Sequence, residues 1–329
     1  MMTINEPNEN EQILKIGKTE LIPGQNTLLK LPAGQLPSGS KVEIQAHIYR
    51  GLRPGPTVLL LAGVHGDEIN GVEIVRKCVY DGYFEELLAG TVIAIPLLNV
   101  FGFNNFSRDV PDGKDVNRAF PGTSSGSLAA RVANVLHKNI LPHVDFGLDF
   151  HTGGRGTYNY PQLRYTPGDE KALAVAEAFG SPLIVASKAP TKSLRRTAKA
   201  TYDLPILTFE GGENQRYDGL SIQTGINGIK RLLVGQLMLA GSIGPEAPKS
   251  VHVIESRWTR AERAGLFQWF KPSGNRVRKG EPIGVISDPH GQLPNQRILS
   301  KKEGFIIGHA NTSVVSQGDA LFHIGKEEA

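Results

Sequence analysis

A histidine and a glutamate stand three positions apart in the stretch LAGVHGDEINGVEIVRK, residues 61–77. His65 and Glu68 follow an apolar run, at the point where Gly63 ends that run and an amphipathic segment begins. Imidazole nitrogens and carboxylate oxygens bind Zn²⁺, but short polar side chains are also common in ordinary turns. The pair by itself therefore indicates either a polar turn or part of a metal site.

Two other apolar runs end in a residue of the same kind. VDFGLDF leads into His151, and PILTF leads into Glu210. Ligand sites in open α/β sheets form at the carboxyl ends of the strands, where loops from different strands converge. Two imidazoles and one carboxylate leave an open fourth position on zinc, which a catalytic zinc needs. We therefore expect His65, Glu68 and His151 to hold one Zn²⁺ ion per chain.

The other residues near these strand ends are less informative. Side chains alternate along a strand, and we expect Asp149 to lie on the face opposite His151, away from the site. The remaining histidines do not follow a strand in this way. We interpret them as structural or surface residues: His47, His137, His143, His252, His290, His309 and His323.

A second informative stretch is NNFSRDVPDGKDVNRAFPG, residues 104–122. Its Asp, Asn, Gly and Pro content is typical of a loop, yet it carries Arg108 and the Asn117–Arg118 pair. An arginine can bind a carboxylate through two parallel hydrogen bonds, and an asparagine can add a neutral donor. The alternative is that Arg118 only closes the loop onto a neighbouring aspartate, Asp112 or Asp115.

The composition limits the class of protein. The chain has 329 residues and a formal charge of +4 without a long block of like charges, which argues against a nucleic-acid partner. The start MMTINEPNENEQ lacks the pattern of a signal peptide, and no run is long and apolar enough to span a membrane. Cys78 is the only cysteine, so any metal must be held by His, Asp and Glu. We expect a soluble cytoplasmic enzyme that does not bind a membrane.

The elements that position these residues follow from periodicity. Strand-like runs occur at residues 41–49, 57–63, 91–97, 144–150, 181–187 and 205–209. Helical patterns occur at residues 71–83, 127–141, 169–180, 193–203 and 218–240, most with Ser, Asp or Asn near the start. Strands that alternate with helices and are apolar on both faces indicate an α/β layered sheet with parallel pairs.

The pattern changes after residue 245. The segment GSIGPEAPKS is typical of a linker, and short strand-like runs separated by Gly and Pro follow it. We expect two domains, an α/β domain at 1–245 with an N-terminal β segment and a smaller all-β domain at 246–329. Residues 277–283 and 315–321 share the form Val-x-x-Gly-acid-x-aliphatic, a two-copy repeat.

This C-terminal part resembles the half-barrel of biotinyl and lipoyl carrier domains. Those carriers place a modifiable lysine, usually flanked by methionine, in the hairpin between the two halves. Lys301 and Lys302 lie nearby in this chain but lack the flanking pattern. A carrier role is therefore not expected, and a packing or lid role near the active site is favoured.

Together, the motifs HGDE, RDVPDGKDVNRAFPG, DFHTG and EGG resemble the succinylglutamate desuccinylase and aspartoacylase family, which is related to the zinc carboxypeptidases. The resemblance covers residues 55–245 and includes the β tail. It implies a zinc-carboxypeptidase-like mixed sheet flanked by helices, with zinc on His65, Glu68 and His151.

The same resemblance implies roles for further residues. Glu210 is expected to be the general base, with Glu213 as its rival, and Arg108 the oxyanion stabiliser. Asn117 and Arg118 are expected to bind the α-carboxylate of the substrate. The implied reaction is hydrolysis of the amide of a small N-acyl amino acid.

Several alternatives stay open at this point. The chain could be a zinc carboxypeptidase acting on short peptides, or an inactive binding protein, and it could form a homo-oligomer. A pocket for a second carboxylate would need another cation. The basic segment 188–199 supplies five cations, although such a charge run is usually the solvated face of a helix.

Overall fold

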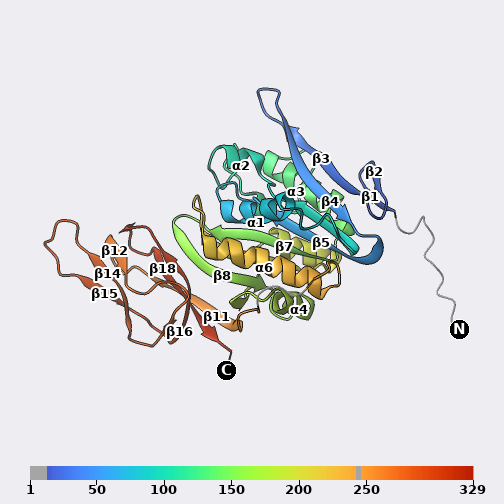
Figure 1. The fold of residues 1–329 in the computed structure, drawn as a ribbon. Helices are drawn as coiled ribbons and strands as arrows, with labels where there is room; N and C mark the ends of the chain where they lie inside the picture. The colour runs from blue at the N-terminus through green and yellow to red at the C-terminus, as the bar shows by residue number, and fades with distance from the viewer. Residues whose placement is uncertain (1–12, 242–245, 329) are drawn as a thin grey trace.

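A mixed sheet of twelve strands runs through the part of the chain that the computed structural model describes, residues 13–241 and 246–328 (Figure 1). In order across the sheet the strands are β13 (Arg276–Val277), β16 (Gly304–Ala310), β18 (Ala320–Glu327), β11 (Val251–Arg260), β9 (Leu183–Ala186), β8 (Thr157–Tyr165), β10 (Ile206–Glu213), β7 (Phe146–Gly153), β5 (Arg53–Ala62), β6 (Ala89–Ile95), β4 (Lys41–Arg50) and β3 (Asn26–Gln35). The central strands β10, β7, β5 and β6 are parallel, whereas β3 and β4 are antiparallel. The mixed α/β class is therefore confirmed.

Helices cover both faces of the central strands. The α-helices are α1 (Ile69–Tyr80), α2 (Val100–Asn104), α3 (Leu128–Asn139), α4 (Glu170–Phe179), α5 (Leu194–Tyr202) and α6 (Gly219–Gly235), with short 3₁₀ turns η2 (Val116–Arg118) and η3 (Leu141–His143). Successive residues of β5 face opposite ways, as expected for a strand. Leu59 and Leu61 pack into one core with α3 and α5, and Leu60 packs into a second core with α1, α4 and α6.

The predicted elements are present, with ends that differ by a few residues. Each of the six strand-like runs and five helical patterns corresponds to an element of the structure. Side-chain oxygens of Ser127, Asp169, Ser193 and Asp218 accept hydrogen bonds from the first turns of α3, α4, α5 and α6. The prediction missed β3 and β8. Strand β8 reads TYNYPQLRY, and its polar residues and internal Pro161 hide the alternation of a typical strand.

The C-terminal β segment, residues 246–328, contains strands and no helix among its described residues. Some of its strands extend the main sheet, and the others form a separate four-stranded sheet. The order in that second sheet is β15 (Gln296–Leu299), β14 (Pro282–Ser287), β12 (Gly265–Trp269) and β17 (Val314–Val315). At the other end of the chain, β1 (Leu14–Ile16) and β2 (Thr19–Leu21) form a small hairpin.

The sequence repeat corresponds to a repeated local structure. In both copies a short strand leads through a glycine with positive φ, Gly280 or Gly318, into a longer strand. The acidic residue after each glycine accepts a backbone hydrogen bond from three positions earlier, at 2.8 Å for Glu281 and 2.7 Å for Asp319. The Val and aliphatic positions of both copies are buried in one core. The predicted internal repeat is therefore confirmed, while the half-barrel assignment stays a prediction.

Main-chain pairing joins the C-terminal β segment to the rest of the molecule. Strand β11 pairs in parallel with β9, and β16 pairs with β8 antiparallel, so that Gly308 lies opposite Asn159. The predicted linker includes residues 242–245, which lie outside the described residues, and the division into two domains stays a prediction. The N-terminal stretch 1–12, on which the expectation of an unexported chain rests, also lies outside them.

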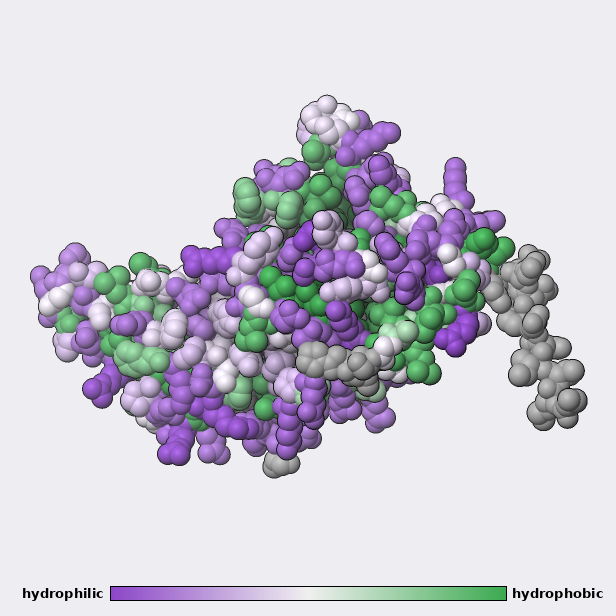
Figure 2. All heavy atoms as spheres, in the orientation of Figure 1, coloured by the Kyte–Doolittle hydropathy of each residue, from purple (hydrophilic) through white to green (hydrophobic). Residues whose placement is uncertain are grey.

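Hydrophilic residues cover most of the face drawn in Figure 2, and hydrophobic residues appear there in small groups. Such a mixture is usual for a protein surface. Within the described residues, no helix combines the length and the apolar character needed to cross a membrane. Cys78 is buried as a free thiol.

Candidate active site

Three side chains with metal-binding atoms meet at the carboxyl ends of two neighbouring parallel strands. His65 and Glu68 follow β5, and His151 lies near the end of β7. The Nδ1 atoms of both histidines lie 2.8 Å from the Glu68 carboxylate, and one donor atom from each residue lies within 4.8 Å of the others. All three residues are buried. The group could hold a metal ion.

The turn between β5 and α1 brings His65 and Glu68 to this point. Glu68 occupies the N-cap position of α1, and its backbone N–H donates to the His65 carbonyl at 3.3 Å. Gly66 lies between them, directly against α2. A Cβ at this position would lie 2.0 Å from the Gly102 carbonyl carbon, so only glycine fits. The turn therefore depends on a close backbone contact that the two polar residues alone do not reveal.

The electrostatics of the group favour a bound cation. Burial alone would lower the pKa of both histidines. Nearby carboxylates raise it instead: Glu68 and Asp115 raise the pKa of His65, and Asp149 and Glu68 raise the pKa of His151. Burial alone would raise the pKa of Glu68, but the two imidazoles hold it well below its usual value. The Nδ1 atoms of His65 and His151 are only 3.1 Å apart, so two protonated nitrogens would face each other. A metal ion replaces both protons and removes that conflict.

Two aspartates lie behind the imidazoles. Asp115 Oδ1 is 3.1 Å from His65 Nε2. Asp149 Oδ2 is 2.8 Å from His151 Nε2. The two atoms form an ion pair, but their geometry does not meet the angle requirements of a hydrogen bond. The expectation that Asp149 lies on the opposite face is wrong. Asp149 and His151 are two positions apart on β7, and residues at that spacing share a face of a strand. Carboxylates in these positions orient metal-binding histidines.

Arg108 lies beside the metal group. Its Nη1 donates to Glu68 Oε1 at 3.1 Å, while Nε and Nη2 donate to Asp115 Oδ2 at 3.2 and 2.9 Å. Burial would raise the pKa of Asp115, but His65 and Arg108 hold it far below its usual value. Asp115 thus connects a predicted metal ligand with the predicted oxyanion stabiliser.

The Asn117–Arg118 pair lines the same pocket, in η2. Arg118 is exposed and donates through Nη1 to the Asn117 carbonyl at 2.8 Å. The alternative in which Arg118 closes the loop onto Asp112 or Asp115 is not observed, because Asp112 pairs with Lys114 and Asp115 with Arg108. Asn117 Oδ1 accepts from Leu194 N at 2.9 Å, so the group that Asn117 can offer a ligand is its NH₂ donor.

Glu210 enters the pocket from β10, next to β7. Both of its carboxylate oxygens contact residues of β8: Oε1 lies 3.3 Å from Arg164 Nη1, and Oε2 accepts from Asn159 Nδ2 at 2.8 Å. The rival base Glu213 instead accepts from Asn311 Nδ2 at 2.7 Å, in the C-terminal β segment, and does not line this pocket. The sequence analysis did not identify Asn159 or Arg164, because β8 itself was not predicted.

The basic segment 188–199 is not simply a solvated helix face. Arg196 is exposed, as that interpretation requires, but Arg195 is only 6% exposed and lines the pocket. Burial, with a contribution from nearby Arg164, lowers the pKa of Arg195 to about 10. Its Nη2 donates to Ser187 at 2.9 Å, whereas its buried Nη1 has no hydrogen-bond partner among the described residues. The expectation is wrong for Arg195 because the N-terminal turn of α5 packs inward.

These residues surround one cavity of about 360 Å³. One wall comes from the C-terminal β segment, where Trp258 of β11 stacks on His323 with ring centroids 4.6 Å apart. The two tyrosines that follow His151 do not line this cavity. Tyr158 packs against His309, and Tyr160 packs against Phe305. The pocket therefore combines residues from both parts of the chain.

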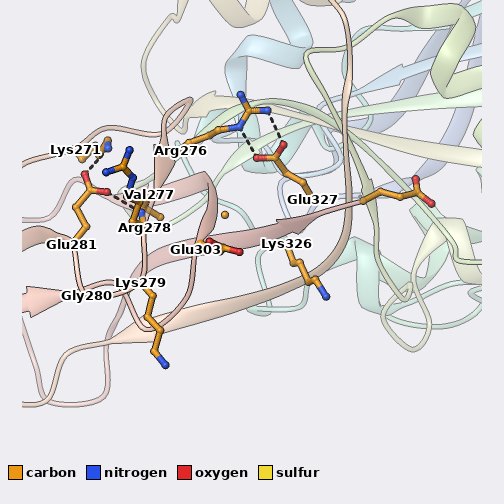
Figure 3. Close-up of a pocket in the computed structure, with 12 residues that line it drawn as sticks. Lys271, Arg276, Val277, Arg278, Lys279, Gly280, Glu281, Glu303, Lys326 and Glu327 are labelled. Carbon is orange, nitrogen blue, oxygen red and sulfur yellow. Dashed lines mark hydrogen bonds and ion pairs between the residues drawn. The ribbon is translucent and has the colours of Figure 1, made fainter.

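A larger cavity, of about 960 Å³, lies on the C-terminal β segment (Figure 3). Charged side chains line it, and several of them neutralise one another: Lys271 pairs with Glu281 at 2.5 Å, and Arg276 pairs with Glu327 at 2.7 Å. None of the predicted site residues lines this cavity. We therefore take the smaller pocket as the candidate active site.

Comparisons with known proteins match most of the chain. The model of the succinylglutamate desuccinylase/aspartoacylase catalytic domain matches residues 54–235. The N-alpha-acetyl-L-2,4-diaminobutyric acid deacetylase of Halomonas elongata is 28% identical over 313 residues, 90% of each chain. A succinylglutamate desuccinylase/aspartoacylase structure from Rhodobacter sphaeroides has a TM-score of 0.81 at 28% identity and covers 92% of this chain and 96% of that one.

A second solved structure has the same fold. The product-bound ectoine utilization protein EutE (DoeB) of Ruegeria pomeroyi has a TM-score of 0.81 at 23% identity, with coverage of 92% of this chain and 94% of that chain. At this level of identity the similarity concerns the fold alone. Each structural match covers 92% of this chain, which is more than the family model matches.

Proposed function

We propose a function from one premise: the chain belongs to the succinylglutamate desuccinylase/aspartoacylase family. Members of this family are deacylases, so the chain is an enzyme that acts on acyl amides. We propose that it hydrolyses the amide bond of a small N-acyl amino acid with the help of zinc. The observation that carries the proposal is the single pocket in which a His–Glu–His group, a carboxylate and several arginines meet.

Zinc fits the donor set of this site. The Nδ1 atoms of His65 and His151 and the carboxylate of Glu68 would hold it, and Asp115 and Asp149 would keep the imidazoles in place. When bound, zinc lowers the pKa of water to about 7 and acts as a Lewis acid. The cluster contains no cysteine, which agrees with a hard or borderline cation held by nitrogen and oxygen.

Glu210 is the proposed general base. Amide hydrolysis requires a proton to leave the attacking water and a proton to reach the leaving amine, and one carboxylate can do both in turn. Glu210 lies in the pocket, and Asn159 and Arg164 fix its orientation. Arg108, which borders the metal group, would stabilise negative charge on the carbonyl oxygen, a contribution of about 3 kcal/mol for one well-placed donor.

Asn117 and Arg118 are the residues proposed to bind the α-carboxylate of the substrate. Arg118 makes no ion pair with another described residue, so its guanidinium can form a charge-assisted contact with a ligand. The NH₂ group of Asn117 can add a neutral donor on the same short turn. This placement would make a free carboxylate on the substrate important for turnover.

A second candidate concerns the acyl group. Arg195 is buried beside the pocket with an unpaired Nη1, and Arg164 lies close to it. An unpaired buried donor is costly, and a carboxylate on the ligand would satisfy it. This observation favours a substrate with a second acidic group, such as an N-succinyl compound, over one with a plain acetyl group. The Halomonas relative is named for an N-acetyl substrate, so the two must be compared directly.

A panel of substrates tests the proposal. It contains N-acetyl, N-succinyl and longer N-acyl amino acids, each as the free acid and as the amide-capped form, together with short peptides. We expect one free acid to be hydrolysed at least about a hundredfold faster than its capped form, because a desolvated carboxylate contact contributes several kcal/mol. Arg118→Ala should remove most of that preference, and release of amine and acid products is the measurement.

Each other outcome has a distinct meaning. Equal rates for capped and free forms would remove the carboxylate role of Arg118. Efficient release of the C-terminal residue from peptides would replace the deacylase proposal with a carboxypeptidase. A preference for N-succinyl compounds that Arg195→Gln abolishes would select the second candidate. Absence of turnover on the whole panel, with metal bound, would favour the binding-protein alternative.

A further inference from the structure

Strand β8 connects the proposed general base to the C-terminal β segment through one buried residue. Asn159 pairs on one side with Gly212 of β10, the strand that carries Glu210, and on the other side with Gly308 of β16. The residue is 4% exposed, and its side-chain Nδ2 donates to Glu210 Oε2 at 2.8 Å. The amide orientation follows from chemistry, because a carboxylate can only accept and the NH₂ group must face it.

Gly308 determines where the Asn159 side chain can lie. A Cβ at position 308 would lie 2.7 Å from Asn159 Oδ1 and 3.2 Å from the Tyr158 carbonyl oxygen. The first distance is too short for any stable contact, so a larger residue there would displace the amide from Glu210. The C-terminal β segment therefore leaves open, at Gly308, the space beside which the Asn159 amide lies.

We propose that Asn159 is a positioning residue for the general base, and that the C-terminal β segment fixes it through Gly308. Asn159 and Arg164 each hold one oxygen of Glu210, so the carboxylate has one orientation in the pocket. A base must lie within hydrogen-bond reach of its proton, and small displacements reduce turnover strongly. The C-terminal β segment thus contributes to catalysis from behind the base, in addition to forming a wall of the pocket.

This inference rests on the proposed role of Glu210. A double-mutant cycle separates the positioning role of Asn159 from the role of Glu210 as the base. We would measure kcat, KM, zinc content and thermal unfolding for Asn159→Ala, Asn159→Asp, Glu210→Gln and the Asn159→Ala/Glu210→Gln double variant of the full-length zinc enzyme. The substrate is the best one of the panel, and the slow variants are measured in single turnovers with enzyme in excess.

We expect Asn159→Ala to lower kcat about tenfold or more, with KM and zinc content close to those of the parent enzyme. Asn159→Asp keeps the shape of the side chain but places a carboxylate against Glu210, so its loss should be at least as large. In the Glu210→Gln background, Asn159→Ala should cost less than about twofold, since the base that it positions is gone.

Gly308→Ala tests the contribution of the C-terminal β segment. Gly308→Ala should lower kcat as Asn159→Ala does. The loss should likewise become small in the Glu210→Gln background. Gly284→Ala is the matched control, because its Cβ would approach the Gln268 carbonyl oxygen to 2.9 Å within the four-stranded sheet, away from β8 and β10. It should alter the unfolding temperature with little effect on kcat.

The results that would overturn the inference are distinct from those that would overturn the base. Near-normal kcat in Asn159→Asp, or equal losses from Asn159→Ala with and without Glu210, would assign Asn159 a purely structural role. Equal kcat in Gly308→Ala and Gly284→Ala would remove the link to the C-terminal β segment. Near-normal turnover in Glu210→Gln itself would instead overturn the proposed base.

Discussion

At the scale of single residues, Asp115 connects His65, Arg108 and Asn117. Its two oxygens reach His65 and the Arg108 guanidinium, and Oδ1 also accepts from the Asn117 backbone N–H at 2.7 Å. The Asp115 carboxylate thus orients the proposed metal ligand His65 and the proposed oxyanion stabiliser Arg108. It also orients the turn η2, which carries the proposed substrate-binding residues. The three functions depend on a residue that the sequence offered only as a possible loop partner for Arg118.

The first prediction at this scale concerns the metal. Purified protein should bind close to one zinc ion per chain, and His151→Ala should lose most of it, because two protein ligands hold zinc far less tightly than three. His143→Ala, which changes a histidine outside the site, serves as the control. Elemental analysis of the two variants is the measurement. Full zinc content in His151→Ala would show that the ion lies elsewhere.

The second prediction concerns the base. Glu210→Gln should keep the fold and the zinc content while lowering turnover about a hundredfold or more, because it removes proton transfer and leaves the metal group intact. Glu213→Gln should retain most of the activity, since Glu213 faces Asn311 instead of the pocket. Steady-state rates decide between the two, and the reverse pattern would assign the base to Glu213.

At the scale of elements, the site depends on how closely α1 packs on β7. Gly71, in the first turn of α1, allows this approach, since a Cβ there would lie 2.5 Å from the Phe150 carbonyl oxygen. Glu68 lies directly before this helix, and His151 directly follows Phe150. A change in the spacing of these two elements would therefore move two of the three proposed ligands relative to each other.

We predict that Gly71→Ala lowers the free energy of unfolding by about 1–3 kcal/mol, as overpacking does, and weakens zinc binding as well. Gly235→Ala is the matched control. That residue is also helical, in α6, but a Cβ there would meet nothing within 4 Å, so alanine should stabilise by up to about 1 kcal/mol. Denaturant unfolding and zinc titration check both variants. Normal zinc affinity in Gly71→Ala would show that the site tolerates the displacement of α1.

At the scale of the whole molecule, the C-terminal β segment contains two neutral histidines, the buried His309 and the partly buried His323. Burial lowers the pKa of His309 to about 4 and that of His323 to about 3. His309 Nδ1 accepts from the Ser273 backbone N–H at 3.1 Å, a contact that a proton on Nδ1 would break. Arg164 adds a positive charge near His323. Both side chains lie close to β8 or to the pocket wall.

These shifts predict a stability that falls on acidification. In the unfolded chain both histidines are protonated near pH 6.5. In the folded chain His309 stays neutral down to about pH 4 and His323 down to about pH 3. Stability from the neutral histidines is thus complete above about pH 6.5 and is lost as the pH falls through the folded pKa values. The unfolding temperature should drop between pH 7.5 and 5, and the drop should be smaller in His309→Gln and His323→Gln. His290→Gln changes an exposed histidine and should leave the size of this drop unchanged.

The sequence by itself predicted most of the elements and the residues of the candidate site. Apolar runs that end in His65, His151 and Glu210, alternating with capped amphipathic helices, specify parallel strands whose polar ends converge. The motif residues also specify the family. These features are local, because each depends on the spacing of a few neighbouring residues along the chain.

Only the tertiary structure decided what surrounds those residues. Asn159 and Arg164 lie on a strand without a clear alternating pattern, and they contact Glu210 because β8 pairs with β10. Arg195 in a charged stretch becomes a pocket residue because of the way α5 packs, and Trp258 joins the pocket from the C-terminal β segment. These contacts are between residues far apart in the sequence, and a local pattern carries no information about which distant side chain fills the space beside it.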